Sequence, residues 1–250
     1  ENKSMSVSKR EEIKAQRLQK KRKERATVMV GTGVVILVVV LLLGLPSLID
    51  RYRPAGDYVT ITPVAYPLAD GRAIGDPSAP VVIEVFEDFQ CSACKVFTES
   101  TEVELLASDY IANGQVYYIF RNFPFEDNSS SIKSSDQAAN AVMCANEQER
   151  FWDYHSMLYA NQDPSSATAY SDRRLIAFAE ALGLDMSQFR SCFNDNAYAA
   201  EIQADIDRAD EYGVNGTPSV FVNGTHITPG YVPAYSDLVT AINAILMPTE

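Results

Sequence analysis

Histidine and cysteine are scarce in this chain, whose 250 residues include two histidines and four cysteines. A zinc site needs four ligands, drawn mostly from Cys and His at short spacings. His155 and His226 do not have such a spacing. Two of the cysteines form a single CxxC motif, and the other two form no second one. These absences argue against a zinc site, and we expect neither a metal nor a cofactor.

A clear cleavage site is missing from the N-terminal region, although a long apolar run is present. Residues 26–49 contain 24 consecutive uncharged residues, and residues 1–25 carry ten Lys or Arg and four Asp or Glu. A secretory signal has a shorter apolar core that ends at an A-x-A-like site. About 20 helical residues cross a bilayer core of ~30 Å, so the sequence predicts an uncleaved transmembrane anchor at 26–49. The positive-inside rule places residues 1–25 in the cytoplasm, beside anionic lipid, and everything after Asp50 outside it.

Basic residues are few beyond this anchor. The whole chain has a net charge of −12, and residues 1–25 carry +6, which leaves −18 for residues 26–250. Nucleic acids and anionic membrane surfaces attract basic domains. The charge therefore argues against nucleic-acid binding and predicts a solvated acidic surface for the exported part.

One short motif carries chemistry, Cys91-Ser92-Ala93-Cys94, which follows an apolar run at residues 81–86. At the N-terminus of a helix, unpaired N–H groups and the helix dipole favour a thiolate and lower a cysteine pKa to about 3.5–7.5. The second cysteine, one turn later, lies close enough to form a disulfide with the first and to resolve a mixed one. A strand followed by this motif predicts thiol–disulfide exchange.

The other two cysteines, Cys144 and Cys192, lie in segments of helical composition. An even number of cysteines on the oxidising side of a membrane favours pairing. A Cys144–Cys192 disulfide would close a loop of about 49 residues and stabilise the fold by roughly 4 kcal/mol. The alternative is two unpaired buried thiols.

The part of the chain beyond the anchor divides into a tether and a domain. Proline and glycine mark residues 50–73 as a linker, in which residues 58–61 are a candidate short strand. The domain is expected at residues 74–250.

Within this domain, buried strands are expected at 80–87 and 115–123, and Asn223-Gly224 predicts a hairpin that joins 219–222 to 225–228. Helices are expected at 91–107, 132–147, 149–161, 171–182, 186–194, 197–212 and 234–246. The order is strand, helix, strand, helical block, hairpin, helix. It predicts an α/β thioredoxin fold with an inserted helical subdomain at about 131–211.

Five short motifs lie in order over about residues 74–247. They are GDP at 75–77, leading to FEDFQCSAC at 86–94, then FWDYH at 151–155, LGLD at 182–185 and GVNGTPSVFVNG at 213–224. Together they resemble the DsbA-like disulfide oxidoreductases of the thioredoxin superfamily. The resemblance implies a thioredoxin fold with a helical insertion, and membrane anchoring is common in such proteins.

The resemblance also assigns roles to residues of the site. It implies that Cys91 is the nucleophile, that Cys94 is the resolving thiol, and that Thr217-Pro218 is a cis-proline loop facing them. The exposed backbone of such a loop pairs with an extended substrate and holds its cysteine near the nucleophile. From the residues alone, an ordinary trans proline that opens a strand is the alternative.

The chain departs from the family between its two cysteines. Strong oxidases of the family have Pro-His there, and this chain has Ser92-Ala93. We therefore expect a less acidic Cys91 and a less oxidising couple. Glu87 and Asp88 would also disfavour the thiolate if they lie close. A carboxylate that takes the Cys94 proton is the weaker alternative, since acidic residues at strand ends are usually solvated.

These features predict a membrane-anchored thiol:disulfide oxidoreductase that exchanges its Cys91–Cys94 disulfide with exported client proteins. The favoured direction is oxidation, with reoxidation by a membrane partner of the DsbB or VKOR type. The alternatives are a reductase or isomerase on the same fold and an accessory subunit of a membrane complex. The redox potential of the pair separates the first two.

Overall fold

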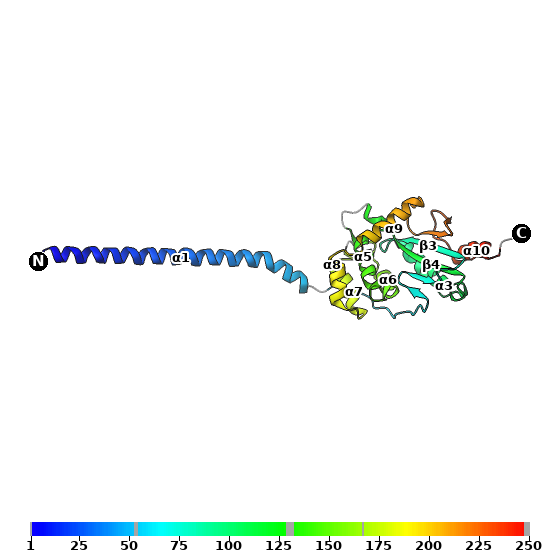
Figure 1. The fold of residues 1–250 in the computed structure, drawn as a ribbon, viewed down its shortest axis with the longest axis horizontal. Coiled ribbons are helices and arrows are strands. Elements are labelled where there is room, and N and C mark those ends of the chain that lie inside the picture. The colour runs from blue at the N-terminus through cyan, green and yellow to red at the C-terminus, as the bar shows by residue number, and fades with distance from the viewer. Residues whose placement is uncertain (1, 53–54, 129–132, 167, 248–250) are drawn as a thin grey trace. The chain divides into compact units, whose positions relative to one another are not determined.

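The structure is a computed structural model, and it describes residues 2–52, 55–128, 133–166 and 168–247. The chain divides into two compact units, one ending at Pro54 and the other beginning at Ala55. The first is a single helix, α1 (Asn2–Tyr52), drawn in blue in Figure 1. Within it, Glu11–Leu43 is long and apolar enough to cross a membrane, with a mean hydropathy of 2.8 in its most apolar part. This segment contains most of the predicted span.

The second unit is built on one mixed sheet. Among the described residues, its strands are β1 (Ala69–Asp70), β2 (Ala73–Gly75), β3 (Val81–Glu87), β4 (Val116–Asn122), β5 (Ser219–Val222) and β6 (Thr225–Ile227), in the order β1-β2-β4-β3-β5-β6. Strand β3 runs parallel to β4 and antiparallel to β5. The predicted hairpin is confirmed, because β5 and β6 pair across Asn223 and Gly224, whose φ values of 45° and 78° suit a two-residue turn.

Strand β3 lies inside the sheet, and both of its faces are buried. Its side chains alternate between two apolar cores. Ile83 and Val85 belong to the larger core, whereas Phe86 packs beside Phe221 in a smaller one. Because successive side chains of a strand point to opposite faces, a continuous apolar run suits this position. The strand ends just before Cys91.

The segment after the CxxC motif is helical throughout. It consists of α2 (Ser92–Phe97), the π-helical turn η1 (Thr98–Glu102) and α3 (Val103–Leu106). Together they correspond to the helix predicted at 91–107. The middle turn contains a buried carboxylate, Glu102. Turns of this wider kind occur frequently at functional sites.

In the part of the chain that the structure describes, the remaining helices are α4 (Asp109–Ala112), η2 (Phe125–Asn128), α5 (Ser134–Asn146), α6 (Phe151–Ala160), α7 (Asp172–Ala181), α8 (Met186–Asn194), α9 (Ala199–Glu211) and α10 (Tyr235–Leu246). In Figure 1, α5 to α8 lie to the left of β3 and β4, and α10 lies to their right. Helix α10 packs against β3, β5 and β6, and α9 packs against β4. The block from α5 to α9 forms the predicted insertion, although residues 131 and 132, at its expected start, lie outside the described residues.

Part of the segment predicted as a linker, residues 50–73, packs on the domain. The ring of Tyr58 contacts that of Phe178 with centroids 5.5 Å apart. The Asn161 side chain accepts a hydrogen bond from the backbone N–H of Val59 (2.7 Å) and donates one to its carbonyl oxygen (2.8 Å). The candidate strand at residues 58–61 is therefore wrong, since a side chain takes the place of a neighbouring strand. Proline and glycine indicated irregular backbone here, but irregular backbone still packs.

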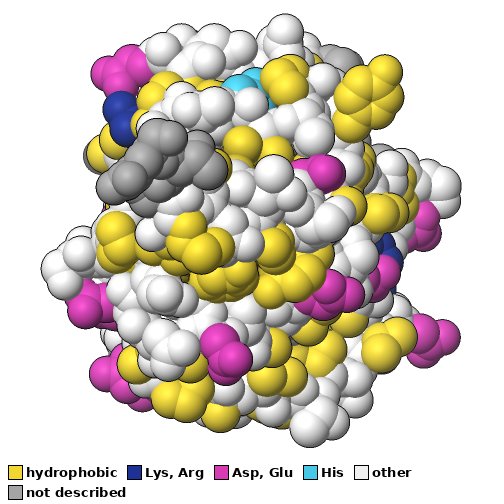
Figure 2. Space-filling view, turned by 90° about the vertical axis from the view of Figure 1, so that its right-hand side faces the viewer, with side chains coloured by type: hydrophobic (Ala, Val, Ile, Leu, Met, Phe, Trp, Pro, Cys, Tyr) yellow, Lys and Arg dark blue, Asp and Glu magenta, His cyan; other side chains and the backbone are white. Residues whose placement is uncertain are grey.

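The surface of this unit is acidic where Figure 2 shows it. On that face, which is the side of α10, hydrophobic side chains form a broad band. Asp and Glu side chains are scattered around the band, and Lys and Arg are sparse. This face agrees with the negative charge expected from the sequence.

Candidate active site

Cys91 lies at the junction between the central strand and α2. Its backbone adopts an extended conformation (φ −73°, ψ 118°) as the residue preceding the helix, and its N–H donates to the carbonyl oxygen of Asp88 at 3.0 Å. The turn from β3 into α2 therefore places the Cys91 side chain at the helix N-terminus. Cys91 is 9 % exposed and Cys94 is fully buried, and both are free thiols.

The two thiols have opposite acid–base properties. Hydrogen bonding from the Cys94 thiol, together with contacts to Thr217 and to the backbone of Cys94 and Ala93, lowers the pKa of Cys91 to about 6. Burial raises the pKa of Cys94 well above its ordinary value, and its hydrogen bond to Cys91 and the charge of Glu87 raise it further. The Cys91 pKa is thus lowered without the histidine that the family's strong oxidases have in the motif.

The predicted loop faces the first cysteine. The Thr217–Pro218 peptide bond is cis, as the resemblance implies. The Cys91 thiol donates to the Thr217 carbonyl oxygen at 3.3 Å. Both loop residues line a cavity of about 480 Å³, together with Ala93 of the motif and the exposed Tyr231. The fold therefore brings together the four residues that the sequence marks as a site.

Glu87 and Asp88 differ from the expectation that they are solvated, because each is only 1 % exposed. The Asp88 carboxylate accepts hydrogen bonds from the backbone N–H groups of Gln90 and Glu126 and from the Ser135 hydroxyl, at 2.7–2.8 Å. Burial outweighs these bonds and raises the pKa of Asp88 to about 7. Asp88 thus shapes the turn that leads to the motif.

Glu87 lies close to Cys94 in the interior. Its Oε2 accepts hydrogen bonds from the Tyr159 hydroxyl (2.7 Å) and the Thr98 hydroxyl (3.3 Å), and its Oε1 has no partner among the described residues. Burial raises the pKa of Glu87 well above its ordinary value, and the nearby charge of Glu102 adds to the effect. This burial supports the alternative interpretation, in which the Glu87 carboxylate takes the proton of Cys94.

Two further residues of the interior were missed from the sequence as site residues. Glu102, which is 2 % exposed, accepts a hydrogen bond from the Tyr118 hydroxyl, and burial raises its pKa to about 7. His155 Nε2 lies 3.7 Å from Glu102 Oε2, and burial lowers the His155 pKa to about 3, so the ring is neutral. The spacing of residues in the sequence could have pointed to Glu102. Cys94, Thr98 and Glu102 follow one another at intervals of four residues, which places them on one face of a helix.

Glu87, Glu102 and His155 also offer ligand atoms that lie within 4.8 Å of one another. Carboxylates and imidazole suit divalent metals, but zinc ligands sit about 2.0–2.2 Å from the ion, so these atoms would have to draw closer together. We interpret Glu87, Glu102 and His155 as three buried titratable side chains that lie close together.

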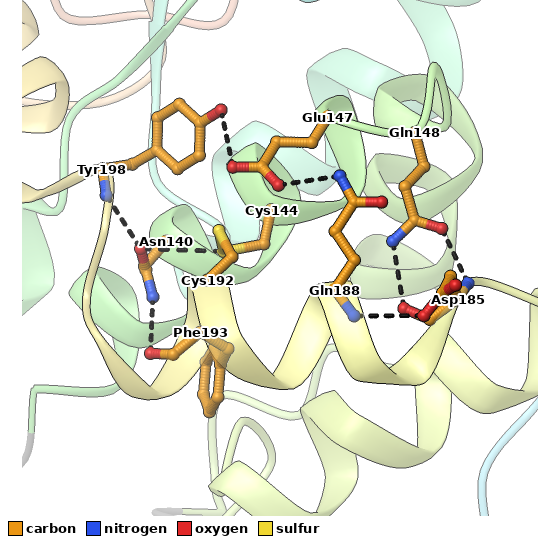
Figure 3. The surroundings of a disulfide bond; sticks show 9 residues. All are labelled: Asn140, Cys144, Glu147, Gln148, Asp185, Gln188, Cys192, Phe193 and Tyr198. Carbon is orange, nitrogen blue, oxygen red and sulfur yellow. Dashed lines mark hydrogen bonds between the residues drawn. A yellow bond between two sulfur atoms is a disulfide. The ribbon is translucent and has the colours of Figure 1, made fainter.

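The predicted disulfide between Cys144 and Cys192 is present and joins α5 to α8 (Figure 3). Amide side chains surround it. Asn140 donates to the Phe193 carbonyl oxygen at 3.1 Å, and Gln188 donates to Glu147 at 3.0 Å. These contacts hold the two helices together beside the sulfur atoms.

The sheet order and the cysteine pair at a helix N-terminus define a thioredoxin fold. Residues 68–244 match the family model described as Thioredoxin, so the chain belongs to that family. The predicted fold class is confirmed.

The chain is also similar to individual proteins. The chain is 28% identical over 162 residues to the probable disulfide bond formation protein D of Bacillus anthracis, covering 64% of this chain and 73% of that protein. It is 36% identical over 166 residues to Na(+)/H(+) antiporter NhaA 3 of Salinispora tropica, but this region spans only 24% of the antiporter. The oxidised structure of BdbD from Bacillus subtilis matches with a TM-score of 0.62 at 23% identity, covering 70% of this chain and 92% of that chain.

Proposed function

We propose that this chain is a thiol:disulfide oxidoreductase whose reactive pair is Cys91 and Cys94. The observation that carries the proposal is the position of Cys91 at a helix N-terminus, where its pKa is lowered to about 6. The thiolate is the nucleophile and the better leaving group in disulfide exchange, and Cys91 is largely thiolate at neutral pH. The relative from Bacillus anthracis, named a probable disulfide bond formation protein, supports the same activity.

The exchange takes place in two steps. A client thiolate attacks Sγ of Cys91 in the oxidised pair, the Cys91–Cys94 bond breaks, and Cys94 leaves with the electron pair and gains a proton. A second client thiolate then attacks the client sulfur of the mixed disulfide, and Cys91 leaves as a thiolate. The client loses two electrons and two protons and gains a disulfide, and the enzyme pair is reduced.

Glu87 serves as the proton acceptor for Cys94. When the pair is reoxidised, the buried Cys94 must lose its proton before it attacks the mixed disulfide on Cys91. Glu87 is the carboxylate whose charge raises the pKa of Cys94, and its own pKa is raised by burial. A general base with a raised pKa is suited to transfer a proton near neutral pH.

The loop at Thr217 and Pro218 binds the client. The Thr217 carbonyl oxygen is 3.3 Å from the Cys91 sulfur, so an extended segment that pairs with this backbone brings its own sulfur to Cys91. The adjoining cavity of about 480 Å³ accepts the neighbouring side chains of the client.

The favoured direction is oxidation of client proteins, because a low Cys91 pKa stabilises the reduced enzyme and makes its disulfide more oxidising. In that case, a membrane partner of the DsbB or VKOR type takes the electrons. A reductase or isomerase is the second candidate, favoured by the Ser92-Ala93 dipeptide.

Helix α1 serves as an uncleaved membrane anchor. Its apolar segment is long enough to span a bilayer, and the basic residues 1–25 before it favour a cytoplasmic N-terminus. The thioredoxin domain then lies on the extracytoplasmic side, where clients acquire disulfides.

The redox potential of the Cys91–Cys94 pair tests both the activity and its direction. The protein is equilibrated with glutathione buffers, quenched with acid and alkylated, and mass spectrometry gives the fractions of oxidised and reduced protein. An oxidase is expected to have a potential above about −200 mV, and a value near −270 mV or below supports the reductase instead. A pair that stays fixed in one state, with no catalysis of exchange, contradicts the proposal.

A further inference from the structure

The proton on Cys94 has no direct way to solvent. Cys94 is fully buried, and the proposed acceptor, Glu87, is 1 % exposed. Each catalytic cycle protonates and deprotonates Cys94 once, so the proton has to cross the protein interior twice. Glu87 alone can store this proton but cannot deliver it to water.

The hydroxyl of Thr98 contacts Glu87, and a second carboxylate, Glu102, lies four residues further along the same helix. Thr98 Oγ1 donates to Glu87 Oε2 at 3.3 Å, and Thr98 lines the same cavity as Glu102. Thr98 and Glu102 are the first and last residues of η1 and follow Cys94 at intervals of four residues. The helix that begins at the CxxC motif therefore aligns a thiol, a hydroxyl and a carboxylate along one face.

Glu102 borders a cavity that reaches the surface. This cavity has a volume of about 260 Å³, and Thr98, Glu102 and His155 line it. Val64 and Glu99 line the same cavity and are more than half exposed, with exposed fractions of 59% and 58%. This cavity holds several water volumes, and polar side chains form part of its lining, so it gives Glu102 access to solvent.

We propose that Thr98 and Glu102 extend Glu87 into a proton path between Cys94 and this cavity. The inference rests on the proposed function. In the outward direction, the Cys94 S–H bond breaks, its electron pair stays on sulfur, and Glu87 gains the proton. The Thr98 hydroxyl accepts a proton from Glu87 while it gives its own to Glu102, which releases one to cavity water or buffer. One proton leaves the thiol and one enters solvent, and no electron moves along the path.

Apart from Cys91, whose pKa is lowered to about 6, the other groups around this path do not change charge in the same pH range. Those facing Glu87 and Glu102 are Cys91 and Cys94 from α2, Tyr118 from β4, His155 and Tyr159 from α6, and Tyr66. Burial raises the pKa of Tyr118 and Tyr159 and keeps them as hydrogen-bond donors, while the low pKa of His155 keeps it neutral. Glu87 and Glu102 are thus the carboxylates in this group, and burial raises the pKa of both.

The test uses Thr98→Val and Glu102→Gln in the full-length protein, with Glu99→Gln as the matched control. Glu99 is on the same helical turn and lines the same cavity, but it is exposed and pairs with Lys95. The rate of Cys91–Cys94 disulfide formation from the reduced protein, with glutathione disulfide as oxidant, is measured by acid quench from pH 5 to pH 9.

Near pH 6.5, both path variants are expected to close the disulfide about tenfold more slowly, at the low end of the effect of a proton-transfer group. Their rates are expected to approach that of the wild type at pH 9, where hydroxide takes the proton. Glu99→Gln is expected to follow the wild type at every pH.

Two results overturn the path: wild-type profiles in both variants, or a loss of rate that is the same at all pH values, which indicates a structural role. Circular dichroism checks folding, and if Glu102→Gln does not fold, Thr98→Val decides, because valine keeps the shape of threonine. A wild-type protein that forms no disulfide refutes the proposed function, and the path with it. A wild-type protein that reacts normally beside unaffected variants refutes only the path.

Discussion

The chain contains two cysteine pairs in contrasting surroundings. Cys91 and Cys94 are three positions apart at a helix N-terminus, and the buried carboxylate of Glu87 lies close to them. Cys144 and Cys192 are 48 positions apart and join two helices among amide side chains and the exposed Glu147 (Figure 3). We infer that the function of each pair follows from the groups around its sulfur atoms. A helix terminus and a proton acceptor favour thiol–disulfide exchange, whereas two packed helices favour a permanent structural disulfide.

The largest effect on this contrast between the two pairs is expected when a reactive cysteine is replaced by serine. Cys91→Ser is expected to reduce turnover more than about 10³-fold, because it removes the nucleophile. Cys94→Ser is expected to accumulate mixed disulfides with clients through Cys91, since the resolving thiol is gone. Non-reducing electrophoresis and mass spectrometry detect the trapped species. The roles are reversed if Cys91→Ser remains active and only Cys94 forms adducts.

Removal of the second pair is expected to affect stability and leave exchange intact. The double variant Cys144→Ala, Cys192→Ala loses a cross-link across 48 positions, worth about 4 kcal/mol or less in the chain-entropy model. Urea unfolding of the wild type and the variant measures the difference, and the exchange rate of the folded variant is the control. A variant that is as stable as the wild type but inactive would contradict the division of roles.

A smaller effect is expected when the acceptor beside the reactive pair is neutralised. Glu87→Gln should slow closure of the Cys91–Cys94 disulfide by about 10–100-fold near neutral pH, because the Cys94 proton loses its base. Asp88→Asn is the matched control: Asp88 is equally buried, but its carboxylate holds backbone N–H groups of the turn. We expect it to lower stability without changing the pH dependence of closure. Equal pH profiles for both variants would remove the special role of Glu87.

The smallest effect concerns the pH dependence of stability. The pKa values of Asp88 and Glu102 are raised to about 7 in the folded state, from ordinary values of 3.8 and 4.5. Their contribution is therefore fully present below about pH 4 and is lost as the pH rises through 7. Between pH 7 and pH 6, each carboxyl should add about 1 kcal/mol, whereas Cys91 of the reduced protein, whose pKa is lowered to about 6, should remove about 1 kcal/mol. The reduced protein should therefore gain about 1 kcal/mol on acidification, since one proton taken up per pH unit changes the free energy by ~1.4 kcal/mol. Urea unfolding at both pH values checks this, and Glu102→Gln should flatten the dependence.

Local signals in the sequence were sufficient for several of the elements and for the reactive pair. The apolar run before Cys91 predicted the buried strand, Asn223-Gly224 predicted the hairpin, and the helix over Met186–Asn194 has the predicted limits. Each of these depends on residues that are neighbours in the chain, so pattern and spacing are enough.

Contacts between distant segments could not be predicted in the same way. The Asn161 side chain binds the backbone of Val59, 102 positions away, and nothing near Val59 indicates it. Glu87 was expected to be solvated and Glu102 was not singled out, because the burial of both depends on how η1, β4 and α6 pack over them. The carboxylate cluster beside the reactive pair is thus a property of the tertiary structure.

The cavity beside Glu102 has a consequence for spectroscopy. Trp152, the only tryptophan of the chain, lines this cavity, and its ring centroid lies 5.2 Å from that of His155. All indole emission of the protein therefore arises within one small region, next to the buried carboxylates. A change in intrinsic fluorescence during reduction or titration can be assigned to this region without labelling or mutation.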